Sequence, residues 1–349
     1  PILKGSNMTS FILALFSTRN KLRISSLYQV ITGKRTSSVL IYSFLNHLLF
    51  IHGSFPKMNQ EEFTRIIDQL VDQKFLIQLE DGVMITHLGE KALAEEIIDL
   101  EGLHYDRYGR TAENCWRLIK FAVQVVSHLV NNKKEYLPIE TSPYYTIQVK
   151  KWLADTQLDR QTLAKKLSQE LSEIFSTLTS ESANFLANQF SGIQSPGLLT
   201  YQLTEITNEV QRELYEAKQV HLLLKTIEEK KDSLLFQLVS PLLMQNFNQS
   251  MLTTRKLILS GCSIDEVMKI RHLKRGTVTD HLIEWQLYLT DFPYQKMITK
   301  QTFKRLSQLS NIKEWNYREL NEVAPLDYGE FRFYQIGVLK GELKNVAEG

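Results

Sequence analysis

The sequence has few cysteines, prolines and glycines, and each shortage excludes a class of protein. Its 349 residues include 2 cysteines, 8 prolines and 15 glycines. Two cysteines cannot form a disulfide framework, so the sequence favours a reducing compartment and predicts a cytoplasmic protein, free or associated with the nucleoid. The low proline and glycine contents exclude a collagen-like or low-complexity chain.

Long hydrophobic runs are also missing, although the chain is apolar enough to fold. Hydrophobic residues make up 43% of the sequence, which is ample for real cores. No run approaches 18 uninterrupted apolar residues, so no membrane-spanning helix is predicted. The length predicts two or three domains. Residues 1–7, which precede Met8, are interpreted as a cloning remnant and left out of the fold prediction.

Motifs of common catalysts are absent from the sequence. It contains no G-x-G-x-x-G, H-E-x-x-H or G-x-S-x-G motif. Residues 32–35 resemble the end of a phosphate-binding loop, but Arg35 stands where that loop needs serine or threonine. The cysteines and histidines lack the spacing of a zinc site. We therefore predict a non-enzyme with no catalytic residue, cofactor, metal or small-molecule substrate.

Positive charge is scarce overall but concentrated in two segments. The formal net charge is only +2. Residues 1–57 contain seven basic residues and no acidic one, whereas residues 58–100 carry a charge of −7. Residues 251–305 carry a charge of +5. Cationic segments attract polyanions such as nucleic acid, but the same residues would also suit solvated helix faces.

The first hundred residues predict a winged-helix-like unit. Residues 59–73 have the apolar spacing of an amphipathic helix. Two short apolar runs, 75–79 and 83–86, flank the tight-turn pair Asp81-Gly82 and predict a small β-hairpin. A new helix follows from His87. Helix, hairpin and helix in this order are typical of winged-helix units, which bind either DNA or proteins.

The sequence of the middle region predicts helices and contains no functional motif. Amphipathic patterns predict five helices, at residues 111–129, 148–155, 159–177, 180–190 and 203–239. The last of these should end before Pro241, because the residue before proline disfavours the α conformation. Gly192, Pro196 and Gly197 indicate a linker.

The most informative segment predicts a helix-turn-helix. A helix over 253–260 ends at Gly261, a candidate left-handed cap. Ser263 and Glu266 have the spacing of a capping box and begin a second helix. A turn at 271–274 leads to a third helix. Two helices joined by such a turn form a helix-turn-helix.

Candidate nucleic-acid-binding residues lie at two predicted helix starts. The first set surrounds the start of the third helix and consists of Arg271, Lys274, Arg275, Thr277, Thr279 and His281. Their cationic, hydroxyl and backbone N–H groups could bind phosphate. The second set precedes a helix predicted over 39–50, after one at 22–31, and consists of Lys34, Arg35, Thr36 and Ser37. At both places the alternative is a solvated surface that keeps a packing module soluble.

These patterns predict a mainly α protein with three domains. An N-terminal winged-helix-like domain with a small β-hairpin is expected at 8–105, a helical middle region at 106–240, and a C-terminal helix-turn-helix domain at 241–349.

Two segments resemble known families. The pattern Leu257-x-x-Ser260-Gly261-x-Ser263-Ile264-x-Glu266-Val267, then Arg271-x-Leu273-Lys274-x-x-Thr277-Val278-x-x-His281-Leu282, resembles the C-terminal helix-turn-helix module of many RecQ-family DNA helicases. Residues 328–332 fit the end of that module. Residues 27–38 resemble the start of the YpbB family, helix-turn-helix proteins of Gram-positive bacteria. Gly276 departs from the pattern, since the module often has a capping or small polar residue there.

The resemblance implies a chain without helicase motifs that works with a RecQ-like helicase. We expect a non-enzymatic accessory factor that binds the helicase, DNA or both during replication, recombination or repair. One alternative is a transcription regulator that uses its helix-turn-helix units on an operator. Another is a structural scaffold that does not contact nucleic acid. The sequence leaves the form of DNA, the docking surface for the helicase and the oligomeric state open.

Overall fold

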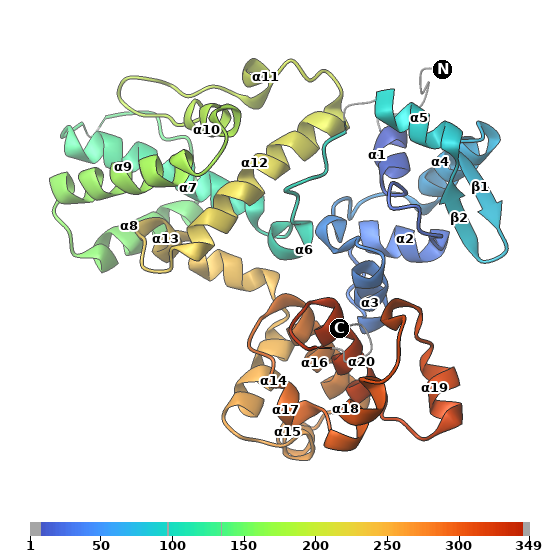
Figure 1. Ribbon diagram of the computed structural model, residues 1–349. Helices are drawn as coiled ribbons and strands as arrows, with labels where there is room; N and C mark the ends of the chain where they lie inside the picture. The colour runs from blue at the N-terminus through green and yellow to red at the C-terminus, as the bar shows by residue number, and fades with distance from the viewer. Residues whose placement is uncertain (1–7, 96–97, 134, 345–349) are drawn as a thin grey trace. The chain divides into compact units, whose positions relative to one another are not determined.

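The computed structural model describes residues 8–95, 98–133 and 135–344, so the predicted remnant 1–7 lies outside the described residues. The chain is mostly helical, with one two-stranded sheet in its described part (Figure 1). The chain forms two compact units. The first unit consists of the chain up to Lys34 and Asn46–Asn246, and the second of Arg35–Leu45 and the chain from Phe247. The division into three domains at 8–105, 106–240 and 241–349 stays a prediction.

The predicted N-terminal helices and hairpin are present in the first unit. The elements are α1 (Thr9–Ala14), α2 (Ile24–Ile31), η1 (Leu49–Ile51), α4 (Gln60–Asp72), β1 (Leu76–Leu79), β2 (Gly82–Ile85) and α5 (His87–Glu95). Asn59 caps α4, because its side-chain oxygen accepts hydrogen bonds from the backbone N–H groups of Glu61 and Glu62. The apolar side of α4 packs inward, with Phe63 and Leu70 fully buried.

The hairpin turn differs by one residue from the prediction. Leu79 pairs with Gly82, so the two turn residues are Glu80 and Asp81 rather than Asp81 and Gly82. Gly82 serves a different purpose, because a Cβ atom there would lie 2.6 Å from the carbonyl oxygen of Leu22. Leu22 and Val83 exchange two backbone hydrogen bonds of 2.8 Å across this close approach. Leu22 thus forms a one-residue bridge to the edge of the hairpin.

That bridge also corrects the predicted helix at 22–31. Helix α2 begins only at Ile24, because Leu22 is held extended against β2. The helix predicted over 39–50 is α3 (Ser37–Leu45), which ends five residues early. The chain leaves the helix through His47, which has a φ of 58°, and then forms η1. The apolar run continues past Leu45, so periodicity alone did not indicate this break.

The middle region is a helical layer around α7. Its elements are α6 (Tyr105–Tyr108), α7 (Ala112–Val130), α8 (Pro143–Thr156), α9 (Arg160–Ser176), α10 (Ser180–Ala187), α11 (Thr200–Leu203), α12 (Glu209–Glu229), α13 (Leu234–Leu243) and η2 (Met244–Asn246). Helix α7 contacts α8, α9, α12 and α13 (Figure 1). Among the helices of the described residues, none is both long and apolar enough to span a membrane.

The long helix predicted over 203–239 is instead two helices, α12 and α13. The break falls at 230–233, where Ser233 begins α13 and its hydroxyl accepts a hydrogen bond from the backbone N–H of Phe236. The predicted stop before Pro241 is also wrong, because Pro241 lies within the last turn of α13. Proline has no N–H to donate to the carbonyl group four residues back, so one helical hydrogen bond is missing at Pro241, and α13 ends two residues later at Leu243.

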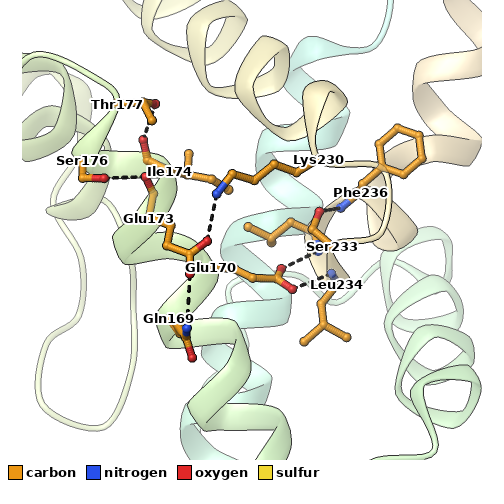
Figure 2. A network of polar contacts seen from close by, with 11 residues as sticks. Gln169, Glu170, Glu173, Ile174, Ser176, Thr177, Lys230, Ser233, Leu234 and Phe236 are labelled. Atoms are coloured by element: carbon orange, nitrogen blue, oxygen red, sulfur yellow. Dashed lines mark hydrogen bonds and ion pairs between the residues drawn. The ribbon is translucent and has the colours of Figure 1, made fainter.

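A carboxylate of α9 supports the start of α13. Glu170 accepts hydrogen bonds from the backbone N–H groups of Leu234 (2.9 Å) and Leu235 (3.2 Å) (Figure 2). Lys230, at the end of α12, donates to Glu173 one turn further along α9, at 2.9 Å. A helix N-terminus leaves such N–H groups unpaired and attracts negative charge. Helix α9 therefore fixes the turn that divides α12 from α13.

A second polar cluster joins α6 to α12 and contains a buried histidine. His221 is 1% exposed, and its Nδ1 accepts a 3.0 Å hydrogen bond from the backbone N–H of His104. The ring is therefore neutral, with its proton on Nε2. Burial, and secondarily His104, lowers the pKa of His221 to about 3. Arg107 and Tyr108 both bind the carboxylate of Glu228 in the same cluster.

This histidine should make the protein sensitive to acid. Between about pH 6.5 and pH 3 the unfolded chain binds a proton at His221 and the folded chain does not, so the free energy of unfolding falls as the pH falls. From pH 6.5 to pH 4.5 the expected loss is roughly 2 to 3 kcal/mol. Urea denaturation across this range measures the loss.

The variant His221→Gln tests the assignment. Its amide oxygen can accept the bond from His104, and it cannot take up a proton, so its stability should depend less on pH. His87→Gln is the matched control, because the His87 side chain is 80% exposed. Equal pH slopes in His221→Gln and the unchanged protein would contradict the role given to His221.

Candidate nucleic-acid interface

The second unit contains the predicted helix-turn-helix. Besides α3 it consists of α14 (Gln249–Leu259), α15 (Ile264–Arg271), α16 (Arg275–Tyr288), α17 (Tyr294–Met297), α18 (Lys300–Leu306), η3 (Ile312–Glu314), α19 (Tyr317–Val323) and α20 (Tyr328–Leu339). Ser263 and Glu266 form the predicted capping box, with Ser263 N–H donating to the Glu266 carboxylate at 2.7 Å. Gly261 follows α14 with a φ of 103°, and His272 closes α15 with a φ of 52°.

Helix α16 is the central helix of this unit. It contacts α3, α14, α15 and α20 (Figure 1). Its residues from His281 to Leu287 are consecutively buried, which means that every side of this part of the helix is covered. A helix that is buried all round cannot lie in a DNA groove along its length. The exposed residues of α16 lie before this stretch, in the first turn and at Asp280, whose carboxylate accepts a hydrogen bond from Ser37.

This first turn collects the exposed candidates. Lys274, Arg275, Gly276 and Thr277 are all exposed, and Thr279 is half-buried. Lys274 is the N-cap residue, and its side chain makes no capping hydrogen bond. The other long helices of the unit that follow Phe247, α14, α15 and α20, each begin at a residue whose side chain accepts a backbone N–H. The start of α16 thus offers N–H donors beside two cations.

Space around this turn is open. A Cβ atom on Gly276 would meet no other atom within 4 Å. Arg275 forms ion pairs with Asp265 at 3.3 Å and Asp327 at 4.0 Å, and its side chain is 55% exposed. Ion pairs this exposed are weak, so a phosphate group can replace the carboxylates. The open space at Gly276 and the exposed side chain of Arg275 leave this turn accessible from solvent.

Two other predicted residues, Arg271 and His281, are used inside the unit. Arg271 donates to the carbonyl oxygen of Ser250 and to the hydroxyl of Thr254, both at 2.6 Å. His281 is 6% exposed and lies 2.9 Å from the same hydroxyl. Burial lowers the pKa of His281, with a further contribution from Arg271. These contacts join α14, α15 and α16 and favour a packing role for both residues.

The four N-terminal candidates, Lys34, Arg35, Thr36 and Ser37, fall into two different units. Arg35 donates to Glu284 of α16 at 2.7 Å, and Ser37 donates to Asp280 at 2.5 Å. Both are therefore committed to carboxylates of α16 within the second unit. Thr36 is exposed and shares a 3.1 Å hydrogen bond with Ser38. Lys34 is exposed and belongs to the first unit.

The contact between α3 and α16 was not predicted. Asp280 and Glu284 are one turn apart on α16, and both accept hydrogen bonds from the start of α3. Glu284 is 4% exposed, and Asn248 donates to its second oxygen at 2.9 Å. The sequence gives one hint of this contact. Residues 1–57 contain no acidic residue, and the third predicted helix carries Asp280 and Glu284 after its basic start. Opposite charges on two residues that lie 249 positions apart in the sequence do not show that their side chains pair.

The winged-helix-like segment presents a different charge. In a winged helix, the helix before the hairpin is the one that usually enters DNA, and here that helix is α4. Its exposed side carries one cation and four carboxylates: Arg65, Glu61, Glu62, Asp68 and Asp72. Such a face repels phosphate, so the charge of α4 argues against a DNA contact there.

The fold and the site define a helix-turn-helix protein. A family described as a helix-turn-helix domain matches residues 250–335, and such domains are typical of DNA-binding proteins. Over most of its length the chain is similar to Protein YpbB of Bacillus subtilis (strain 168). The two are 22% identical over 324 residues, which cover 89% of this chain and 90% of YpbB. The resemblance to the YpbB family predicted from sequence is confirmed. No solved structure matches the chain.

Proposed function

We propose that this protein is a non-enzymatic accessory factor that binds DNA through the first turn of α16 and works with a RecQ-like helicase. The observation that carries the DNA-binding part is the exposed and uncapped start of α16, with Lys274, Arg275 and Gly276 side by side. Unpaired N–H groups and the helix dipole favour an anion at this point, and the two cations add charge. The matching helix-turn-helix family supports the same function.

The geometry favours contact with phosphates over reading of bases. Beyond its first turn, Asp280 and Glu284 of α16 are held by Ser37 and Arg35, and residues 281–287 are buried. Sequence is read by side chains that reach base edges in a groove, whereas phosphate contacts carry no sequence information. One accessible turn therefore suits DNA binding with little sequence preference. This disfavours the alternative of an operator-specific transcription regulator.

The helicase part of the proposal rests on resemblance. The pattern from Leu257 to Leu282 resembles the C-terminal module of RecQ-family helicases, and the 349 residues contain no complete phosphate-binding loop motif. A DNA-binding arm without sequence preference fits a partner that must act on many sequences. The two parts of the proposal are tested separately.

Removing the two cations should weaken DNA binding and its salt dependence. In Lys274→Ala/Arg275→Ala, the slope of log affinity against log salt should fall by about one for each phosphate that the protein no longer neutralises. Fluorescence anisotropy with duplex, forked and single-stranded DNA of several sequences, at a series of salt concentrations, measures both quantities. The unchanged protein should bind duplexes of different sequence with similar affinity.

Two further variants make the test specific. Lys150→Ala/Lys151→Ala removes the same charge from exposed positions on α8 and should leave the slope unchanged. Gly276→Leu keeps the charge but fills the open space at the first turn, so it should weaken binding. Equal losses in both double variants would show that overall charge, and not this turn, binds DNA. A strong preference for one duplex sequence would favour the regulator.

Association with the helicase is measured by size exclusion with light scattering, using the RecQ-like helicase of the same cell. We expect a complex of defined stoichiometry and a changed rate of unwinding. If no complex forms at micromolar concentrations and unwinding is unaltered, the helicase part is wrong. The DNA titration decides the rest of the proposal independently.

A further inference from the structure

A cavity in the first unit has no part in the proposed DNA contact. Its volume is about 1030 Å³, large enough for a small organic molecule. One wall is the segment that precedes α4, including Ser54. The other walls come from α6, α7, α12 and the loop before α11. Ile139, Leu198 and Leu199 form an apolar rim, and they are 41%, 39% and 59% exposed.

Lys120 is the unusual group in this cavity. Its Nζ lies 5.4 Å from the centre of the Trp116 ring, one turn back along α7. Among the described residues no carboxylate lies within ion-pair distance of that ammonium group. Burial lowers the pKa of Lys120, against the opposing effect of Glu216 and Glu140. A half-buried cation without a direct anionic partner is costly unless a ligand supplies the anion.

The neighbouring acids are already engaged. Both oxygens of Glu140 accept hydrogen bonds from Arg117, at 2.6 and 2.9 Å. Glu216 accepts a 2.9 Å hydrogen bond from the hydroxyl of Thr200. These carboxylates moderate the charge of the cavity without neutralising Lys120 directly. Together with Glu62, Glu113 and Glu213 they also make the lining net negative, which excludes a polyanion such as DNA.

Two hydroxyl groups of the cavity lining lack hydrogen-bond partners. Ser54 is 5% exposed, and its Oγ is buried with no partner among the described residues. The Oη of Tyr105 is in the same situation. Burial, and then Glu213, raises the pKa of Tyr105, so this hydroxyl keeps its proton and can donate. Buried polar groups without partners are rare and costly. Both oxygens are closed to the cavity as well as to solvent, so a ligand reaches them only if the lining moves.

We propose that this cavity binds a single carboxylate attached to an apolar or aromatic body. The carboxylate pairs with the Lys120 ammonium group, and the apolar body lies against Ile139, Leu198 and Leu199. A free organic acid and an acidic residue beside an apolar one in a peptide both have this chemistry.

Matched pairs of small molecules test the proposal on the full chain. Each pair is an aryl or branched-alkyl carboxylic acid and its own primary amide, and binding is followed by ligand-observed NMR. The acids should bind more tightly than their amides. Lys120→Met, which keeps the cover over Trp116, should weaken the acids by about tenfold and leave the amides unchanged. Lys151→Met, at an exposed position on α8, is the matched control.

A second arm identifies the source of the carboxylate. Short peptides with an aspartate or glutamate beside leucine or phenylalanine are compared with the same peptides carrying asparagine or glutamine. Ser54→Ala, which keeps all charges, should weaken the preferred ligands less than Lys120→Met does. The proposal is overturned if acids and amides bind alike, if Lys120→Met binds the acids as well as the unchanged protein, or if no acid or acidic peptide binds at millimolar concentration.

Discussion

Replacing Arg35 with alanine should destabilise the second unit by about 3 kcal/mol, although Arg35 lies far before most of that unit in the chain. The Arg35 guanidinium pairs with Glu284 at 2.7 Å and lies 5.4 Å from the centre of the Tyr288 ring. The side chains of Arg35 and Glu284 are 21% and 5% exposed. Removal of Arg35 leaves a buried carboxylate whose remaining hydrogen-bond donor among the described residues is Asn248.

The destabilisation should be confined to the second unit. Hydrogen exchange of the intact protein, read by mass spectrometry, should show faster exchange in α14, α16 and α20 and unchanged exchange in α7 and α9. Arg275→Ala is the matched control, because it removes an arginine from exposed ion pairs with Asp265 and Asp327. Its cost should be under about 0.5 kcal/mol.

A second variant separates the effect of the unpaired charge from that of the missing side-chain packing. Adding Glu284→Gln to Arg35→Ala removes the unpaired carboxylate charge and should recover part of the stability. If Arg35→Ala costs no more than Arg275→Ala, the buried pair does not stabilise the unit and the assigned role of α3 is wrong.

A chain that begins at Phe247 should fail to form a stable helix-turn-helix unit. It lacks α3, whose buried apolar side chains are Val39, Leu40, Ile41 and Tyr42. Each side chain of this size that packs on the second unit contributes about 1.5 to 3 kcal/mol, which is a large share of the stability of a small domain. Urea denaturation followed by the fluorescence of Trp285 and Trp315 should give a shallow transition or none.

Restoring α3 should restore folding. Residues 35–45, joined to Phe247 by a flexible glycine-serine linker, should give a cooperative transition. The same extension with Leu40 and Ile41 changed to aspartate is the control and should remain unfolded. A cooperative transition for the bare 247–349 fragment, equal to that of the linked form, would show that α3 is dispensable.

Much of the second unit follows from local sequence. The capping box of Ser263 and Glu266, the left-handed Gly261 and the apolar spacing of 253–282 depend on residues within a few positions of each other, so they were predicted correctly. The same holds for the hairpin, apart from the position of its turn. Element ends were less accurate, as at Leu45 and Pro241, because apolar runs continue through breaks that packing imposes.

Local sequence predicted only some residues of the candidate site correctly. Lys274, Arg275 and Thr277 are exposed at the start of α16 as local sequence predicts. Arg271 and His281 have the same chemistry as these residues but lie against Thr254, and no local pattern distinguishes the two groups. Their difference arises from which side of each helix the core covers.

The sequence by itself determined that this is a mainly helical protein with a small hairpin and a helix-turn-helix near its C-terminus, because helix caps, turns and periodicity are local interactions. Only the tertiary structure decided that α3 completes the second unit and that Lys120 faces a cavity with Ser54 and Tyr105. Those arrangements depend on contacts between residues far apart in the chain, such as Arg35 with Glu284. Burial and pairing of that kind are set by the packed core and cannot be derived from residue order alone.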